Sequence, residues 1–173
     1  MSHTPLAGAL VLAVVADGVD ASSLECLSIA LRRRGPRLHR ASLDAASVTT
    51  FEGDALDVDV ALNAVHVRYY DALVLPGEGS EAFVRDPWLR ALARAMLDEG
   101  RVVATWGTGA ALLAQLGVDE AYDNVLVAAD RYQLGELVER LCFAVAERRR
   151  DEIEERSVES FPASDAPGGS AAI

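Results

Sequence analysis

The segment from Arg101 to Leu113 carries the residue pattern with the clearest chemical meaning. An apolar run, Val102 to Trp106, is followed by Gly107 and Thr108 and then by an apolar helical pattern. This is the layout of a nucleophile elbow, the sharp strand-to-helix turn that presents an attacking side chain. Gly107 stands at the centre of the turn, and glycine offers no side-chain atom that can attack a substrate. The segment therefore predicts the architecture of a covalent-catalysis site without its attacking group.

Two side chains near this elbow are candidates for other chemistry. Glu78 follows Gly77 in the turn after an earlier apolar run, and its carboxylate would repel an oxyanion but bind a cation or an amine, or act as general base for a water molecule. The alternative for Glu78 is that it points into solvent from a tight turn. Thr108 is either a hydroxyl nucleophile or a helix cap. We expect a cap, because no histidine or lysine lies nearby in the sequence to take its proton.

Alternating apolar runs and amphipathic stretches must position these residues, and this alternation is typical of parallel strands linked by helices. Glycine or proline ends several of the stretches, and Ser22 and Ser23 are the expected caps of the first helix. The expected strands are Ala9–Val15, Arg37–Ser42, Asp71–Leu75, Val102–Trp106 and Asn124–Ala129, with an edge hairpin over Thr49–Asp59. The expected helices run from Ser22 to about Arg34, Pro87 to Gly100, Ala110 to Leu116 and about Leu134 to Arg148, the last with Leu137, Leu141, Phe143 and Val145 on its packed face.

Length and charge limit the possible functions. With 173 residues, 51% of them hydrophobic, the chain can bury one substantial core, and we expect one domain over residues 1–150. Residues 151–173 read as a charged helical extension followed by disorder after Ser157. A formal charge of −11 argues against nucleic acid or an anionic membrane as partner, since both would be repelled. All basic residues are arginine, which excludes Schiff-base, pyridoxal phosphate and phosphate-loop lysine chemistry.

The cysteines and histidines predict neither a disulfide nor a metal site. Cys26 and Cys142 lie far apart within apolar helical patterns, which is the profile of reduced, buried thiols in a cytoplasmic protein. The three histidines are too scattered to ligate a metal from one helix. The apolar run from Leu6 to Ala16 lacks a preceding basic residue and is followed by Asp17, so we expect a buried strand there rather than a secretory signal. We expect no cofactor.

Four blocks of the sequence resemble the DJ-1/PfpI family of the class I glutamine amidotransferase-like superfamily. The blocks are Tyr70 to Gly77, Arg85 to Leu89, Gly100 to Thr105 and Gly109 to Leu113, and the resemblance covers roughly residues 9 to 148. It implies an α/β fold, a flavodoxin-like three-layer sandwich with a mostly parallel central sheet. It also implies a homodimer, because members of this family often dimerise.

The chain departs from the family at each residue that performs its chemistry. Members generally carry a cysteine at the elbow, often a histidine next to it, and a glutamate from the first helix. The resemblance places Gly107, Thr108 and Ser23 at these three positions, with Glu25 as the alternative for the glutamate if the helix alignment slips by two residues. About eight residues separate Leu116 from the last strand, fewer than in relatives, which predicts a site that is either shallow or covered by a second subunit.

Two functional hypotheses follow. The first is a catalytically silent domain that binds a small molecule or a protein partner in a crevice at the carboxyl ends of the strands. We expect Gly77, Glu78, Gly107, Thr108, Ser23 and Asp20 to line this crevice. The second is a non-covalent hydrolase or lyase, of glyoxalase, deglycase or amidase type, in which Glu78 activates water. A third class, the sensor domain of a regulator, is less favoured because no helix-turn-helix segment accompanies the domain.

Overall fold

A six-stranded sheet forms the centre of the molecule. The computed structural model describes residues 6–43, 46–83, 85–118 and 121–159. The sheet has the order β5-β2-β1-β6-β7-β8, and all its neighbouring strands pair in parallel. Its strands are β1 (Leu10–Val14), β2 (Arg37–Ser42), β5 (Val60–Ala61), β6 (Ala72–Leu75), β7 (Val102–Trp106) and β8 (Val125–Ala128). The short, almost wholly apolar strands β1, β6 and β7 fit the middle of a sheet that is covered on both faces.

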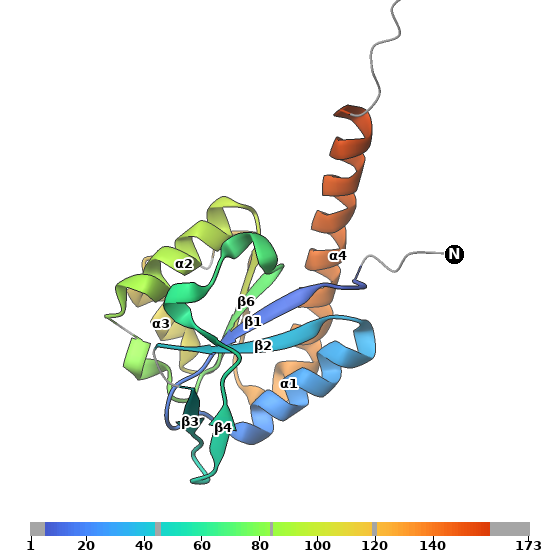
Figure 1. The fold of residues 1–173 in the computed structure, drawn as a ribbon. Coiled ribbons are helices and arrows are strands. Elements are labelled where there is room, and N and C mark those ends of the chain that lie inside the picture. Colours follow the sequence, from blue (N-terminus) through green and yellow to red (C-terminus); the bar gives the residue numbers. More distant parts are fainter. Residues whose placement is uncertain (1–5, 44–45, 84, 119–120, 160–173) are drawn as a thin grey trace, which may run out of the picture.

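Helices cover both faces of the sheet and make the sandwich three layers thick (Figure 1). They are α1 (Ala21–Arg34), α2 (Pro87–Asp98), α3 (Gly109–Gln115) and α4 (Leu134–Glu159). Side chains of β1 alternate between the faces: Val11 and Ala13 pack with α1 and α4, while Leu12 and Val14 pack with α2 and α3. The prediction of a flavodoxin-like α/β sandwich with a mostly parallel sheet is confirmed.

Asp20 caps the first helix, in place of the expected Ser22 and Ser23. Asp20 is the N-cap of α1, and its carboxylate accepts a hydrogen bond from the backbone N–H of Ser22. The expectation that Ser22 and Ser23 serve as caps is therefore wrong, since both already lie inside the helix. Gly35 ends the helix at φ 117°, a conformation that favours glycine.

The expected hairpin forms, but it does not extend the main sheet. Strands β3 (Ser47–Thr49) and β4 (Ala55–Asp57) pair antiparallel in a sheet of their own. Hydrogen bonds tie this hairpin to the loop after β1, with Gly18 N–H donating to the Thr49 carbonyl and Asp17 accepting from Thr49 N–H. The edge of the main sheet on this side is the short strand β5.

Helix α4 continues into the charged extension that the sequence predicted, but one of its expected core residues is exposed. It runs without a break from Leu134 through residue 150, where we had placed the domain boundary, to Glu159. Phe143 is 63% exposed and does not belong to the packed face, which is formed by Leu137, Leu141 and Val145. The disorder expected after Ser157 concerns mainly residues 160–173, which lie outside the described part of the chain. No helix among the described residues is long and apolar enough to cross a membrane.

A buried carboxylate joins α4 to the start of the sheet. Asp71 precedes β6 and accepts a hydrogen bond from the backbone N–H of Leu10 at 2.9 Å. Its other oxygen lies 3.2 Å from a guanidinium nitrogen of Arg148 and 3.3 Å from Nε of Arg149. This Asp71 clamp holds β1, β6 and α4 together.

Candidate functional site

Gly107 forms the sharp turn that the elbow pattern predicted. Strand β7 ends at Trp106, Gly107 follows with φ 57°, and α3 begins at Gly109. The Gly107 N–H donates to the carbonyl of Ala128 at the end of β8, so the turn is fixed to the neighbouring strand. A Cβ built at Gly107 would meet no heavy atom within 4 Å. Residue 107 thus has the positive φ of an elbow, open space in front of it, and no side chain to place there.

The turn that contains Gly77 lies directly against the elbow. A Cβ at Gly77 would lie 2.6 Å from the carbonyl oxygen of Trp106, so no larger residue fits at position 77 without backbone movement. The hydroxyl of Thr108 donates to the carbonyl of Gly77 across the same contact. Residues 77, 107 and 108 are therefore neighbours, as expected for the carboxyl ends of the adjacent parallel strands β6 and β7.

Thr108 has the expected position but not the expected contact. It is the N-cap residue of α3, yet its side chain makes no capping hydrogen bond. Its hydroxyl donates instead to a backbone carbonyl, which does not activate a nucleophile because a carbonyl cannot take the proton. Thr108 thus fastens the Gly77 turn to the elbow.

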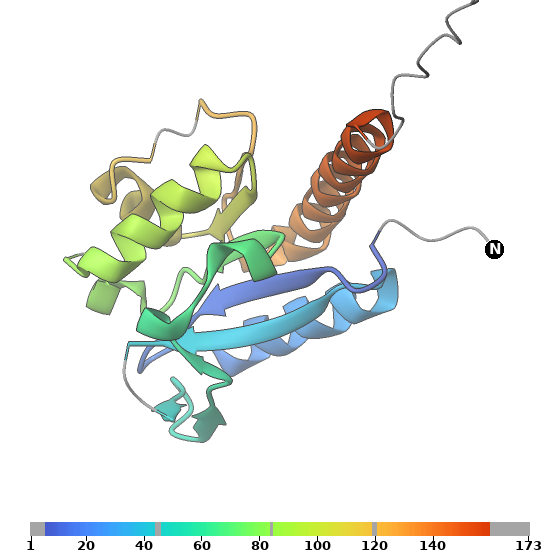
Figure 2. The same ribbon diagram turned by 45° about the horizontal axis from the view of Figure 1, so that its top comes forward.

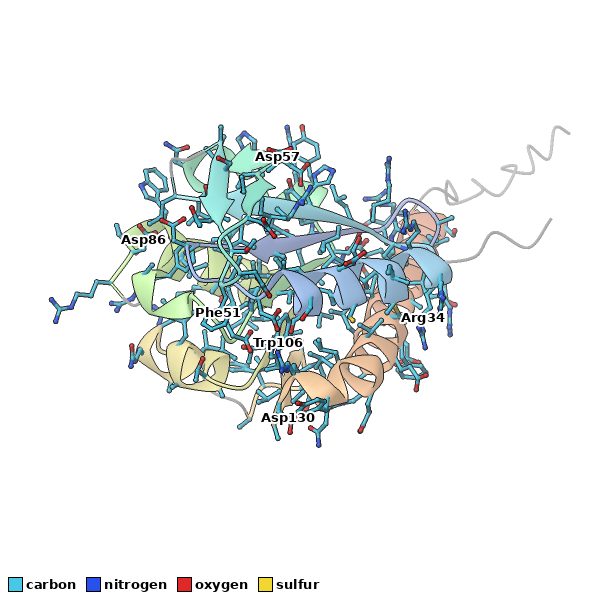
Figure 3. All side chains as sticks on the ribbon, turned by 90° about the horizontal axis from the view of Figure 1, so that it is seen from below. Arg34, Phe51, Asp57, Asp86, Trp106 and Asp130 are labelled. Carbon is cyan, nitrogen blue, oxygen red and sulfur yellow. The ribbon has the colours of Figure 1, made fainter. Side chains whose placement is uncertain are left out.

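Glu78 points toward the elbow strand rather than only into solvent. Its side chain is partly buried, and its Oε2 accepts a hydrogen bond of 3.2 Å from the indole Nε1 of Trp106. Trp106 is fully buried, and it occupies the middle of the molecule in Figure 3. A buried indole N–H needs an acceptor, and Glu78 supplies one. The carboxylate is consequently held beside the elbow.

Asp20 and Ser23 form a cluster with Arg131, and this cluster is separate from the contacts around Gly107. The sequence analysis did not predict a role for Arg131. Asp20 is buried, and its carboxylate accepts hydrogen bonds from both the N–H and the hydroxyl of Ser22 and from the hydroxyl of Ser23. Arg131, just after β8, completes the cluster with an ion pair of 2.9 Å. The sequence could not indicate this pair, because its members lie 111 residues apart.

A small pocket of about 280 Å³ borders this cluster. Cys26, Ser23 and Arg131 line it together with Tyr132, whose ring centroid lies 5.5 Å from the Arg131 guanidinium carbon. Cys26 is exposed and not buried, so the prediction of two buried thiols holds only for Cys142. Leu24 and Leu27 are the buried apolar residues of this helical turn, and Cys26 lies outside the face of the helix that they form. Both cysteines are free.

Hydrogen bonding dominates the titration of Asp20. Burial alone would raise the pKa of the carboxyl, but hydrogen bonds from Ser22, Ser23 and Arg131 outweigh it and hold the pKa well below its usual range. A lowered folded-state pKa stabilises the fold at any pH above the unfolded-state value of about 3.9. This stabilisation is lost as the pH falls below that value and through the folded-state pKa.

The variant Asp20→Asn tests this linkage. We expect it to lower the free energy of unfolding by about 2 kcal/mol at pH 7, because several hydrogen bonds lose their charged acceptor. The difference from wild type should persist to about pH 5 and shrink below about pH 4, as measured by urea unfolding at each pH. Asp130→Asn is the control, since Asp130 caps a 3₁₀ turn through Tyr132 N–H at the exposed surface. A pH-independent difference for Asp20→Asn would contradict the assignment.

Comparison with known proteins supports the family resemblance that the sequence indicated. Residues 9–122 match the model of the DJ-1/PfpI family. Among curated proteins, the deglycase TK1284 of Thermococcus kodakarensis is 30% identical over 62% of this chain and 66% of its own length. The deglycase PfpI of Pyrococcus furiosus is 34% identical over 51% of this chain and 54% of its own. These matches thus span between about half and two thirds of the relatives' length.

Solved structures agree with the family match. DJ-1beta of Drosophila melanogaster superposes with a TM-score of 0.70 at 18% identity, covering 88% of this chain and 99% of that one. A ThiJ/PfpI domain protein of Brachyspira murdochii reaches a TM-score of 0.71 at 12% identity, covering 82% and 98%. At these identities the superpositions establish the fold, and the family model covers well over half of the sequence. This chain belongs to the DJ-1/PfpI family.

Proposed function

We propose that this domain is a catalytically silent DJ-1/PfpI protein that binds a small molecule or a protein partner at the crevice beside its elbow. The observation that carries the proposal is residue 107, a glycine at positive φ with open space before it. The turn keeps the shape that presents a nucleophile but has no thiol, hydroxyl or amine to present. Covalent catalysis from the elbow therefore has no nucleophilic atom at residue 107.

The hydroxyls of the two candidate residues Thr108 and Ser23 are also engaged elsewhere. Thr108, beside the elbow, donates to a backbone carbonyl, and Ser23, in the separate Asp20 cluster, donates to the Asp20 carboxylate. Neither acceptor leaves the oxygen more nucleophilic in the way that a histidine or lysine base would. The Thr108 contact instead stiffens the turn beside the elbow, and a preformed wall favours binding because little ordering remains to be done when a ligand arrives.

Glu78 supplies the chemistry by which a ligand would be recognised. One carboxylate oxygen accepts from Trp106, and the side chain remains partly exposed. A ligand that carries an amine would place a positive charge against this carboxylate. The crevice therefore suits small amines better than oxyanions.

A second function has a specific observation in its favour. Relatives are named deglycases, and Glu78 lies next to the open elbow, where it would serve as general base for a water molecule in a non-covalent hydrolase or lyase. The indole hydrogen bond occupies one of the two carboxylate oxygens and leaves the other for a water or an amine. We favour binding because residue 107 offers no attacking atom.

Enzyme assays decide between the two functions. We expect the purified protein to show no glyoxalase, deglycase or amidase turnover above the buffer blank, and Glu78→Gln to behave identically. Turnover that disappears in Glu78→Gln would establish the enzyme and defeat the silent domain.

Binding is measurable through Trp106. In a Trp88→Phe background the remaining tryptophan is Trp106, because the chain has two. Titration with a simple aliphatic amine should give a saturable fluorescence change that Glu78→Gln removes. An unchanged signal, or one that ignores Glu78, would show that this carboxylate does not recognise amines.

We also infer a cytoplasmic location. The two free cysteines support it, since thiols persist most readily in a reducing compartment.

A further inference from the structure

The cavity beside Arg131 opens between the beginnings of two helices. Helices α1 and α4 lie side by side on one face of the sheet, as Figures 1 and 2 show. Ser22, Ser23 and Cys26 line the cavity from the start of α1, and Leu134, the first residue of α4, also lines it. The cavity measures about 280 Å³, and we call it the Arg131 pocket. A cavity of this size accommodates a small molecule rather than a peptide.

Asp20 has no hydrogen-bonding capacity left for a ligand in this pocket. One of its carboxylate oxygens accepts from the backbone N–H and the hydroxyl of Ser22. The other accepts from the Ser23 hydroxyl and from Nη1 of Arg131. A carboxylate offers about four lone-pair sites in all, and these contacts fill them. A cation or an amine therefore finds no acceptor on Asp20.

Arg131, in contrast, still has N–H groups to offer. Its Nη1 donates to Asp20, and its side chain also contacts that of Tyr132. A guanidinium carries further N–H donors in a rigid planar fork, and the Arg131 side chain is 49% exposed. Such a fork matches the two oxygens of a carboxylate, which it binds through parallel hydrogen bonds. The donors that remain at the pocket therefore select a negatively charged acceptor.

The electrostatic surroundings of the pocket also favour an anion. Among the described residues that line it, Arg131 is the one charged side chain. Asp20 offsets part of this positive charge, while the positive ends of the α1 and α4 dipoles add to what remains. The net charge of −11 opposes the preference, but salt screens exposed charges beyond about 10 Å at 0.1 M ionic strength. The groups at the pocket therefore determine which ligands enter.

Less polar groups form the rest of the wall. Leu134 is buried, Tyr132 presents a ring that is largely exposed, and the Cys26 thiol behaves as a small, weakly polar group. The Tyr132 ring centroid lies 5.5 Å from the guanidinium carbon of Arg131, so the ring and the fork are neighbours. A ligand that places a carboxylate on Arg131 thereby brings its remaining atoms against apolar surface.

We propose that the Arg131 pocket is a binding site for a small monocarboxylate with a flat, apolar body. The ligand carboxylate accepts hydrogen bonds from the remaining N–H groups of Arg131, and the body packs on Leu134 and on the Tyr132 ring. Asp20 already holds the guanidinium in place before the ligand binds, so little side-chain ordering remains to be done. Benzoate has both parts of such a ligand and serves as the probe.

This site is independent of the amine crevice proposed above. Residues 77, 78, 107 and 108, which form the contacts around the elbow, do not line the Arg131 pocket. The two sites also prefer ligands of opposite charge. A protein that binds benzoate but no amine, or an amine but no benzoate, supports one proposal and overturns the other.

The reactivity of Cys26 tests the site, because this thiol is exposed and lines the pocket while Cys142 is buried. At constant ionic strength, benzoate up to about 20 mM, enough to saturate a millimolar site, should slow the alkylation of Cys26 by uncharged iodoacetamide. Mass spectrometry of digested samples gives the rate. The concentration for half-maximal protection should equal the Kd from calorimetric titration. Benzamide lacks the charge and acetate lacks the ring, so each should bind about tenfold more weakly or worse.

Three variants show which group holds the carboxylate, each compared with itself in the absence of benzoate. Arg131→Gln should raise the benzoate Kd about tenfold or more. Arg131→Lys keeps the charge beside Asp20 but not the fork, so its Kd should be intermediate. The control is Arg140→Gln, which removes an exposed arginine of α4 outside the pocket and should leave the Kd unchanged. Circular dichroism verifies that each variant keeps its helices.

Four results would overturn the proposal. They are the absence of benzoate binding, calorimetric binding that leaves Cys26 unprotected, equal protection by benzamide, and protection that survives in Arg131→Gln. An equal loss of binding in Arg140→Gln would reveal a general effect of charge and would overturn it as well. Equal affinity for acetate and benzoate would remove the apolar wall from the assignment.

Discussion

Gly109→Ala is expected to destabilise the domain by about 3 kcal/mol, because the start of α3 has no room for a methyl group. A Cβ at this position would lie 1.8 Å from Oγ1 of Thr105 and 3.0 Å from the carbonyl oxygen of Leu75. Thr105 is fully buried, and its hydroxyl donates to that same carbonyl at 2.7 Å. Neither atom can withdraw without breaking this hydrogen bond or moving the central sheet.

Urea unfolding at pH 7 measures the effect, and Gly135→Ala is its matched control. A Cβ at Gly135 would meet no heavy atom within 4 Å, and Gly135 lies in α4, where alanine is the better helix former by up to about 1 kcal/mol. The control should therefore be neutral or slightly stabilising. Adding Thr105→Ala to Gly109→Ala should recover part of the loss, since it removes the nearest atom. Equal stability of the two glycine variants would show that the elbow packs differently.

Asp71→Ala is expected to cost about 3 kcal/mol, because it removes the buried counter-ion of Arg148 and leaves that guanidinium only the more exposed carboxylate of Glu152. The Asp71 side chain is 10% exposed and that of Arg148 14% exposed. Within the described residues, the Nε of Arg148 already lacks a hydrogen-bond partner, so its charge depends on the remaining contacts. The variant also removes the acceptor of the Leu10 N–H at the start of β1. Asp71→Asn keeps this acceptor and should be intermediate.

An exposed ion pair provides the comparison for this prediction. Glu139 pairs with Arg34 at 2.8 Å, but its side chain is 67% exposed. Glu139→Ala should therefore change the free energy of unfolding by less than about 1 kcal/mol in the same assay. If Asp71→Ala were equally mild, the Asp71 clamp would have to be a surface contact.

The strands of the sheet were predictable because each is marked by the composition of a short segment of the sequence. Runs such as Ala72–Leu75 and Val102–Trp106 are apolar at every position except Thr105, and in a short segment this indicates a strand covered on both faces. Helical periodicity could also have predicted that Cys26 and Phe143 are exposed. Both lie off the sides of their helices that carry the buried residues, such as Leu24 and Leu27 or Leu141 and Val145.

The surroundings of the elbow were predictable only in part. The neighbourhood of Gly77, Gly107 and Thr108 follows from parallel strands, whose carboxyl ends meet at one edge of the sheet. The partners of the polar side chains do not follow from local pattern. Arg131 reaches Asp20 across 111 positions of the chain, and Trp106 reaches Glu78 across 28. Such pairs depend on how the loops after different strands fold back, which neither periodicity nor capping rules describe.

The Asp71 clamp has a consequence for the order in which the protein acquires its structure during synthesis. The ion pair of Asp71 needs an arginine 77 positions later, and one face of the sheet is covered only in part, by α1, until α4 is added. A ribosome releases the first strands long before these partners exist, so the early chain exposes apolar surface on that face. The sheet therefore reaches its final burial only after the last helix has left the ribosome.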